Sequence, residues 1–187
     1  TVVSGRMIGL TINEIEQLAK HHIHVHLYSE SYFKEKDRQN NSMMLIAPKY
    51  FHAHSHCQNN KWTEEFSQYD AGWMHCFQRK NDEDFLKLSW DDINKPSRMG
   101  VFAAAGIPMI QRNNPQQIVA SQELIKEMNI GILFNNIDEL SKKLKDRDNM
   151  NILKQNIMKN RCSFAFDSHI DKLIDFFNKI KQKYNEK

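Results

Sequence analysis

Two segments of the chain combine small residues with cations in a way that suits phosphate binding. The first is Ser4-Gly5-Arg6, which directly follows a short run of β-branched residues. A glycine at this place lets the backbone approach a ligand closely, and an arginine pairs well with phosphate oxygens. The alternative interpretation is a glycine turn beside a surface arginine. No GxGxxG dinucleotide fingerprint is present.

The second segment is Asn94-Lys95-Pro96-Ser97-Arg98, which opens a predicted helix over 96–105 that Gly106 ends. A proline in the first turn leaves N–H groups free at the helix start, where the helix dipole also favours anions. Lys95 and Arg98 add two cations beside that position. The alternative interpretation is an ordinary capped helix with solvated basic residues.

Histidines recur at every second position in two predicted strands, and could suggest zinc. They are His22, His24 and His26, and His52, His54 and His56. Catalytic zinc sites use three protein ligands, and imidazole is a usual one. However, next-but-one positions on one strand rarely converge on one ion, and ligands normally come from different elements. We therefore expect no metal site, and expect histidines near strand ends to bond neighbouring carbonyl groups.

Short apolar runs alternate with amphipathic helical patterns along the whole chain. Strands are predicted at 1–4, 23–28, 51–55, 71–77, 108–111 and 130–134. Helices are predicted at 11–19, 62–68, 96–105, 116–128, 137–144, 151–161 and 170–180, the first with a Thr11–Glu14 capping box. Such alternation is typical of βαβ units, and predicts one α/β domain over 1–187 with a doubly wound parallel sheet. Ligands of such sheets bind at the carboxyl ends of the strands.

Some apolar residues have predictable places within these elements. Trp73 and Phe102 are expected in the core. An apolar stripe follows one face of the last helix, formed by Ile170, Leu173, Ile174, Phe177 and Ile180. The segment 31–49 is ambiguous, and 78–95 reads as a polar excursion with little core.

Composition excludes several classes of protein. The 187 residues are 40% hydrophobic and 26% charged, and no apolar run has the length of a membrane span. A net charge of +3 is too small to indicate nucleic-acid binding. Cys57, Cys76 and Cys162 show no CxxC spacing, which favours a reducing, cytoplasmic compartment. Because the chain does not open with methionine, we expect it to be part of a longer protein.

Four segments, in matching order, resemble the C-terminal domains of GT-B glycosyltransferases of the group 1, or family 4, type. The most specific is N-x-P-x-R at 94–98 followed by A-A-A-G-I-P at 103–108. The others lie at 2–6, at 62–72, and at 130–134 with 136–140. The resemblance covers nearly the whole chain. It implies a Rossmann-like domain that binds a nucleotide-sugar donor for hexosyl transfer in polysaccharide or glycan biosynthesis.

The resemblance also implies roles for individual residues. Ser4, Gly5, Arg6, Ser97 and Arg98 would hold the donor diphosphate, with Asn94 and Lys95 beside them. Tyr28-Ser29-Glu30 and His54-Ser55-His56 would line the pocket for the nucleotide base. Arg98 and Arg6 would be the catalytic cations that neutralise the leaving diphosphate, with no metal cofactor.

One departure and one missing part qualify this resemblance. The family's Glu-x7-Glu pattern is absent, because Ile93 and Val101 stand at its two positions. The N-terminal domain that carries the acceptor site in that family is a further expected partner, and the full-length enzyme could associate with the inner face of a membrane. The alternative is a non-catalytic Rossmann-like domain with a degenerate site that binds a nucleotide or only a protein partner. Val101 favours this alternative.

Overall fold

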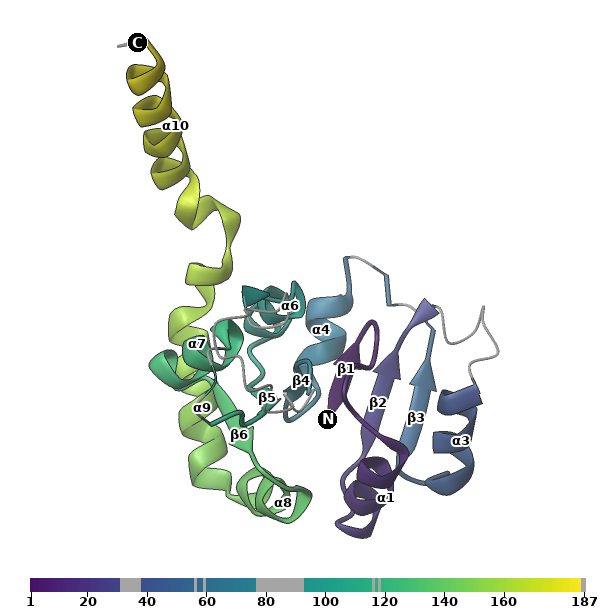
Figure 1. Cartoon of the computed structure of the whole chain (residues 1–187). Coiled ribbons are helices and arrows are strands. Elements are labelled where there is room, and N and C mark those ends of the chain that lie inside the picture. The colour runs from purple at the N-terminus through teal and green to yellow at the C-terminus, as the bar shows by residue number, and fades with distance from the viewer. Residues whose placement is uncertain are drawn as a thin grey trace.

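A computed structural model describes residues 1–30, 38–55, 57–58, 60–76, 93–115, 117 and 119–185. Within them lies one six-stranded sheet in which every strand pair is parallel. The strands are β1 (Val2–Ser4), β2 (Val25–Tyr28), β3 (Phe51–His54), β4 (Gly72–Trp73), β5 (Met109–Arg112) and β6 (Gly131–Phe134). The predicted α/β class and parallel sheet are confirmed (Figure 1).

Helices flank both faces of this sheet (Figure 1). The α-helices are α1 (Ile12–Lys20), α3 (Arg38–Ile46), α4 (Trp62–Ser67), α6 (Arg98–Ala105), α7 (Ala120–Met128), α8 (Ile137–Lys145), α9 (Arg147–Asn160) and α10 (Ile170–Asn185). Two short 3-10 helices, η1 (Arg161–Phe164) and η2 (Phe166–His169), join α9 to α10. Among the described helices, none has both the length and the apolar character needed to cross a bilayer.

The strand order is β3-β2-β1-β4-β5-β6, so the chain builds outward from β1 in one direction and then in the other. The order therefore reverses between β1 and β4, where open α/β sheets form a ligand crevice at the carboxyl ends of their strands. In the described part of the chain, the registered pairing between β1 and β4 is the single pair Val2–Gly72. By comparison, β2 and β3 pair over four residues, from Val25–Phe51 to Tyr28–His54.

The core has one apolar layer on each face of the sheet. One layer includes side chains of α1, α3 and α8, such as Ile15, Met43 and Leu140. The other includes side chains of α4, α6 and α7. Trp73 and Phe102 are fully buried, as predicted, one in each layer. The Trp73 indole N–H donates to the Thr1 hydroxyl at 2.9 Å, which satisfies its one polar group.

Local sequence signals explain several helix ends. Thr11 and Glu14 form the predicted capping box at the start of α1. Asn136 and Asp146 cap α8 and α9 by accepting backbone N–H groups of the first turn. Gly106 ends α6 in the left-handed conformation at φ 71°, which a residue with a side chain adopts at a cost.

The observed bounds differ from the predicted ones at several places; the helix predicted over 151–161, for example, begins at Arg147. The strand predicted over 71–77 is only Gly72–Trp73 within the described residues. The helix predicted from 96 begins at Arg98, although the Met99 N–H already bonds the Pro96 carbonyl as a turn. The helix predicted from 116 begins at Ala120. Most of the predicted excursion over 78–95 lies outside the described residues, as do His56 and 31–37 of the ambiguous segment.

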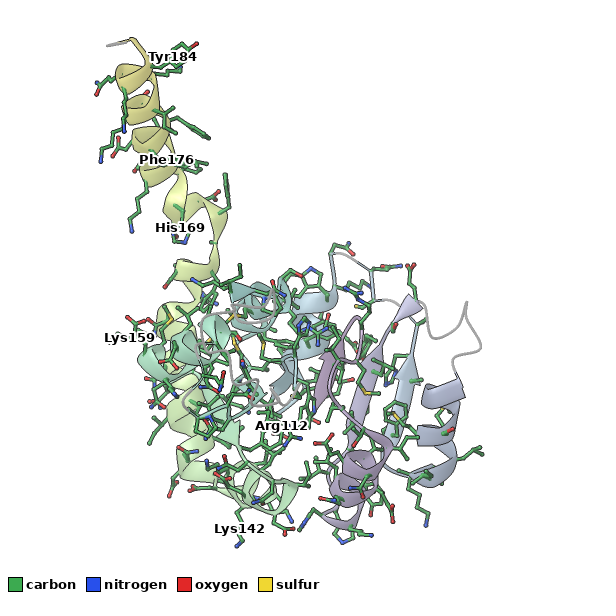
Figure 2. The ribbon with its side chains drawn as sticks, viewed as in Figure 1. Arg112, Lys142, Lys159, His169, Phe176 and Tyr184 are labelled. Carbon is green, nitrogen blue, oxygen red and sulfur yellow. The ribbon has the colours of Figure 1, made fainter. Side chains whose placement is uncertain are left out.

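The last helix projects away from the rest of the molecule (Figure 1). Its existence was predicted, but its apolar stripe is not buried: every described side chain from 171 to 184 is exposed. Figure 2 shows Phe176 and Tyr184 on this helix, well apart from the sheet. The apolar periodicity thus predicts the helix correctly, but no described residue covers its apolar face.

We expect Gly72→Ala to destabilise the fold. A Cβ atom at Gly72 would lie 2.6 Å from ring carbons of the fully buried Phe102, which packs α6 directly onto β4. Overpacking of this kind costs about 1–3 kcal/mol. Urea denaturation followed by circular dichroism measures the change in the free energy of unfolding.

Gly100→Ala is the matched control, because it lies in α6 and a Cβ there would meet only the Phe164 carbonyl oxygen at 3.9 Å. Alanine in a helix is favoured over glycine by about 0.5–1 kcal/mol, so this variant should be as stable as the parent or more so. Equal stability of Gly72→Ala and the parent would contradict the close packing of α6 on β4.

Candidate functional site

Two adjoining cavities open at the carboxyl ends of the strands, where the strand order reverses. Their volumes are about 620 Å³ and about 490 Å³, within the usual range for small-ligand sites. Ser4, Gly5, Arg6 and Val101 line both of them. These shared residues make the two cavities one continuous candidate site.

The first cavity has an aromatic wall. Tyr28 at the end of β2 and Trp62 and Phe66 of α4 line it. The Tyr28 hydroxyl donates to the Glu65 carboxylate and lies 2.7 Å from the Tyr69 hydroxyl. Burial and the bond to Glu65 raise the pKa of Tyr28, so its phenol stays protonated. The Tyr28 side chain is therefore neutral and held in place, and the aromatic wall suits a flat apolar group.

The second cavity is polar and lies against the start of α6. Asn94, Ser97 and Arg98 line it, together with His75 after β4. Backbone N–H groups and the helix dipole make the start of an α-helix favourable for anions. Lys95, predicted beside the diphosphate, is exposed and does not line either cavity.

The loop after β1 carries the residues between the two cavities. Gly5 has φ 80°, a conformation that favours glycine, and its N–H donates to the Tyr28 carbonyl at 2.8 Å. Among the described residues, no atom lies within 4 Å of the position that a Cβ would take at Gly5. This turn presents Arg6 as an exposed cation on the wall shared by both cavities.

Arg98 is held inside the structure. Its side chain is only 7% exposed, and its guanidinium donates to the carbonyls of Trp73 at 3.2 Å and Arg6 at 2.6 Å. Burial lowers the pKa of Arg98 to about 10, so the group is still charged at neutral pH. A guanidinium has five N–H donors. These two bonds give Arg98 a positioning role. Contact between its guanidinium and a phosphate remains a prediction.

Two comparisons with known proteins find no match: no protein-family model matches the sequence, and no curated protein does. Solved structures do match. One is WaaG, a glycosyltransferase involved in lipopolysaccharide biosynthesis, with a TM-score of 0.56 and 12% identity over 94% of this chain. Another is TarM, with a TM-score of 0.56 and 12% identity over 95% of this chain. The chain has the fold of one half of a GT-B glycosyltransferase.

The chain spans only part of these GT-B neighbours. It covers 46% of the length of WaaG and 35% of the length of TarM. At 12% identity the likeness shows the fold alone. It does not establish the group 1 type that the sequence resembles.

Only some of the residues predicted for the base pocket line the first cavity. Tyr28, Ser29 and Glu30 line the first cavity. His54 does not line it, but stacks on the Tyr28 ring with centroids 4.6 Å apart and bonds His26 at 2.9 Å. His54 therefore supports Tyr28 from the side, and His56 lies outside the described residues.

Sequence reasoning missed three residues that line the first cavity: Cys57, Trp62 and Phe66. Cys57 follows β3, and Trp62 begins the helix after it, so both come at the carboxyl end of a strand. That position was the available signal for Cys57 and Trp62. Phe66 gave no such signal, because its burial on the sheet depends on how α4 packs.

We expect Arg98→Met to lower the free energy of unfolding by about 2 kcal/mol, because it leaves the Trp73 and Arg6 carbonyls without their donor. Urea denaturation measures this loss. Arg6→Met is the matched control: Arg6 is exposed, and its replacement should change stability by no more than about 0.5 kcal/mol. If both variants unfold like the parent, the positioning role of Arg98 is wrong.

Proposed function

We propose that this chain is the donor-binding domain of a GT-B glycosyltransferase, and that the two joined cavities bind the nucleoside diphosphate of a nucleotide sugar. One observation carries the proposal. An aromatic cavity and a polar, cationic cavity share four residues at the point where the strand order reverses. A nucleoside diphosphate has the same two parts, a flat base and a charged diphosphate.

The side chains suit these two parts. The base would lie against Tyr28 and Trp62 in the first cavity. The diphosphate would lie between Arg6 and the start of α6 in the second. Sugar transfer releases a diphosphate that gains negative charge, and fixed cations and N–H groups stabilise such developing charge. Arg6, with Arg98 behind it, supplies this positive charge from the chain itself, and no metal cofactor is proposed for the step.

Val101 is a reason to expect that the site binds a nucleotide only weakly. It lines both cavities, so it lies at their junction, where the ribose between base and diphosphate would be. A valine offers the ribose hydroxyls no hydrogen bond, unlike the glutamate common in the family that the sequence resembles. This observation favours a second candidate function, a non-catalytic domain that binds a nucleotide through a degenerate site or binds only a protein partner.

We also propose that the whole protein has a second domain, and that the apolar face of α10 packs against it. The chain covers 46% of WaaG and 35% of TarM. Leu173, Ile174, Phe177 and Ile180 of α10 are each between 38% and 52% exposed. An apolar face of this size is costly in water unless something covers it.

Three free thiols support a reducing, cytoplasmic location.

The first expected outcome is that the chain alone binds a nucleoside diphosphate with a dissociation constant on the order of millimolar. Binding is weak because Val101 lacks a ribose contact and the open site leaves the phosphates in water. Arg6→Ala should weaken binding about tenfold, since a hydrogen bond to a charged group contributes about 1.5 kcal/mol or more. Ligand-observed NMR with UDP, GDP, ADP and CDP measures the affinities.

Lys142→Ala is the matched control, because it removes one exposed positive charge from α8, which carries no residue of either cavity. It should bind like the parent. Absence of binding at saturating nucleotide, or equal affinity in Arg6→Ala and the parent, would overturn the donor-site proposal and favour the partner-binding candidate.

The second expected outcome concerns α10. Removing residues 165–187 should leave the melting temperature within about 2 °C of the parent's, because the described side chains of 171–184 are all exposed. The truncated chain should also self-associate less at high concentration, as should Phe176→Ser with Phe177→Ser in the full chain. Thermal melts and sedimentation velocity measure both effects. A clear loss of melting temperature on truncation would mean that α10 stabilises this domain and not a second one.

A further inference from the structure

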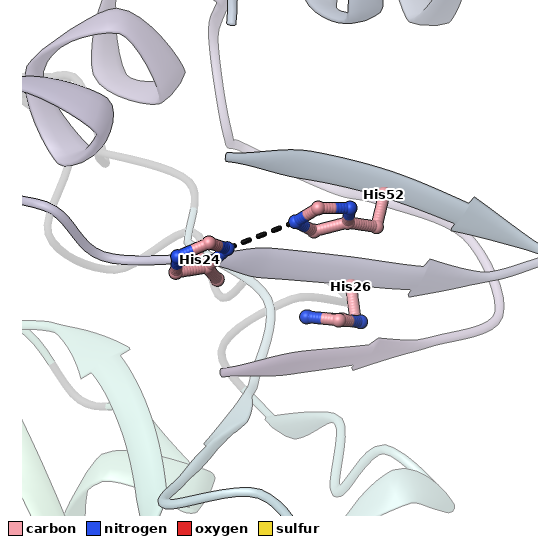
Figure 3. A group of neighbouring side chains, drawn as sticks. All are labelled: His24, His26 and His52. Atoms are coloured by element: carbon pink, nitrogen blue, oxygen red, sulfur yellow. Dashed lines mark hydrogen bonds between the residues drawn. The ribbon is translucent and has the colours of Figure 1, made fainter. Parts of the chain in front are cut away.

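Three histidines from two neighbouring strands meet on one face of the sheet, and none of them lines either cavity. His26 of β2 and His52 of β3 are registered partners, so they lie directly opposite each other. His24 comes two residues before His26, and therefore faces the same side of the sheet. One ligand nitrogen from each of the three lies within 4.8 Å of the others (Figure 3).

The pairing of the strands produces this cluster. On one strand alone, histidines at next-but-one positions face the same side but are separated by two residues, about 6.6 Å along the strand. Side by side, β2 and β3 contribute His24 and His26 from one strand segment and His52 from the other, so the ligands come from two elements. Residue spacing within one strand does not reveal this cross-strand register, so the expectation of no metal site could not take it into account.

The distances in the cluster suit a single ion. His24 Nδ1 and His52 Nε2 are 2.9 Å apart and share a hydrogen bond. Two imidazoles on a tetrahedral zinc ion, at about 2.0–2.1 Å each, have nitrogens about 3.4 Å apart. An ion can therefore replace the shared proton if that pair opens by about half an ångström. His24 is exposed, so its ring is able to move by this amount.

The state of the imidazoles also suits a metal. Burial and the neighbouring histidines lower the pKa of His26 to about 3, and burial lowers the pKa of His52. Neutral imidazole is the form that binds metal ions. The His26 and His52 rings are stacked, with centroids 4.4 Å apart, so one of them must turn about its side-chain bonds before both can point a nitrogen at the same ion.

We propose that His24, His26 and His52 form a binding site for a divalent transition-metal ion, with Zn²⁺ the best match. Three imidazoles with one remaining position for water form a common zinc arrangement, and such a ligand set selects transition metals over Mg²⁺ or Ca²⁺. The site joins β3, the outermost strand on that side of the sheet, to β2.

The metal site does not rest on the proposed function, although one of its ligands lies close to the first cavity: His26 is two residues before Tyr28 and bonds His54, which stacks on the Tyr28 ring. His24 lies four residues before Tyr28, which lines the first cavity. At a rise of about 3.3 Å per residue, the two are about 13 Å apart along the strand. The ion would cross-link β2 and β3 at the edge of the sheet, beside the aromatic wall of the first cavity.

The test uses the full chain with any purification tag removed, titrated with ZnCl₂ by isothermal calorimetry. We expect one equivalent of Zn²⁺ to bind with a dissociation constant on the order of micromolar or below. Zinc at saturation should raise the melting temperature, because the ion binds only the folded arrangement of the three rings. Co²⁺ should give the intense visible absorption of a tetrahedral site.

Matched variants decide whether these three residues hold the ion. His24→Gln and His52→Gln should each weaken zinc binding at least tenfold, while circular dichroism confirms that both remain folded. His169→Gln is the control: this histidine is exposed in η2, outside the cluster, and its loss should leave the affinity unchanged. No saturable binding, several weak equivalents, or full affinity in the His24→Gln and His52→Gln variants would each overturn the proposal.

Discussion

The buried guanidinium of Arg98 is the contact on which the candidate site depends. It joins the first residue of α6 to the end of β4 through the Trp73 carbonyl, and to the loop after β1 through the Arg6 carbonyl. These are the segments that meet where the strand order reverses, and the registered pairing between β1 and β4 contributes little there. These two hydrogen bonds offset part of the cost of burying the charge. The same contact fixes the backbone that carries the exposed Arg6.

The remaining geometry of the site follows from how each helix is held to the sheet. Phe102 packs α6 against Gly72, at a distance that only glycine allows. On the other side of the crevice, Tyr28 bonds Glu65 and Tyr69, and so ties β2 to α4 and the turn that follows it. The first cavity lies between these two anchored helices, so its aromatic wall has little freedom to move. A rigid, preformed wall reduces the ordering cost of binding a flat ligand.

Sequence reasoning predicted elements better than contacts. Periodicity and capping signals are local, so the capping box at Thr11 and the helix end at Gly106 could be predicted from residue types alone. The same local signals could not show that the Arg98 side chain is buried, because its carbonyl partners lie 25 and 92 residues away. Nor could they give the register that sets His26 opposite His52. The stripe on α10 indicated a helix correctly, but what covers an apolar face depends on partners that periodicity does not specify.

The short contact between β1 and β4 has a consequence for how the molecule opens. In the described part of the chain, one registered pair, Val2–Gly72, joins the three strands on one side of the sheet to the three on the other. Side chains cross the same line, among them the Trp73 bond to Thr1, the Arg98 bond to the Arg6 carbonyl and the ion pair of Arg112 with Glu14. Amide hydrogen exchange should therefore divide the domain into two cooperative units that separate along this line. The crevice lies on the same line, so a ligand that contacts both halves would slow their separation.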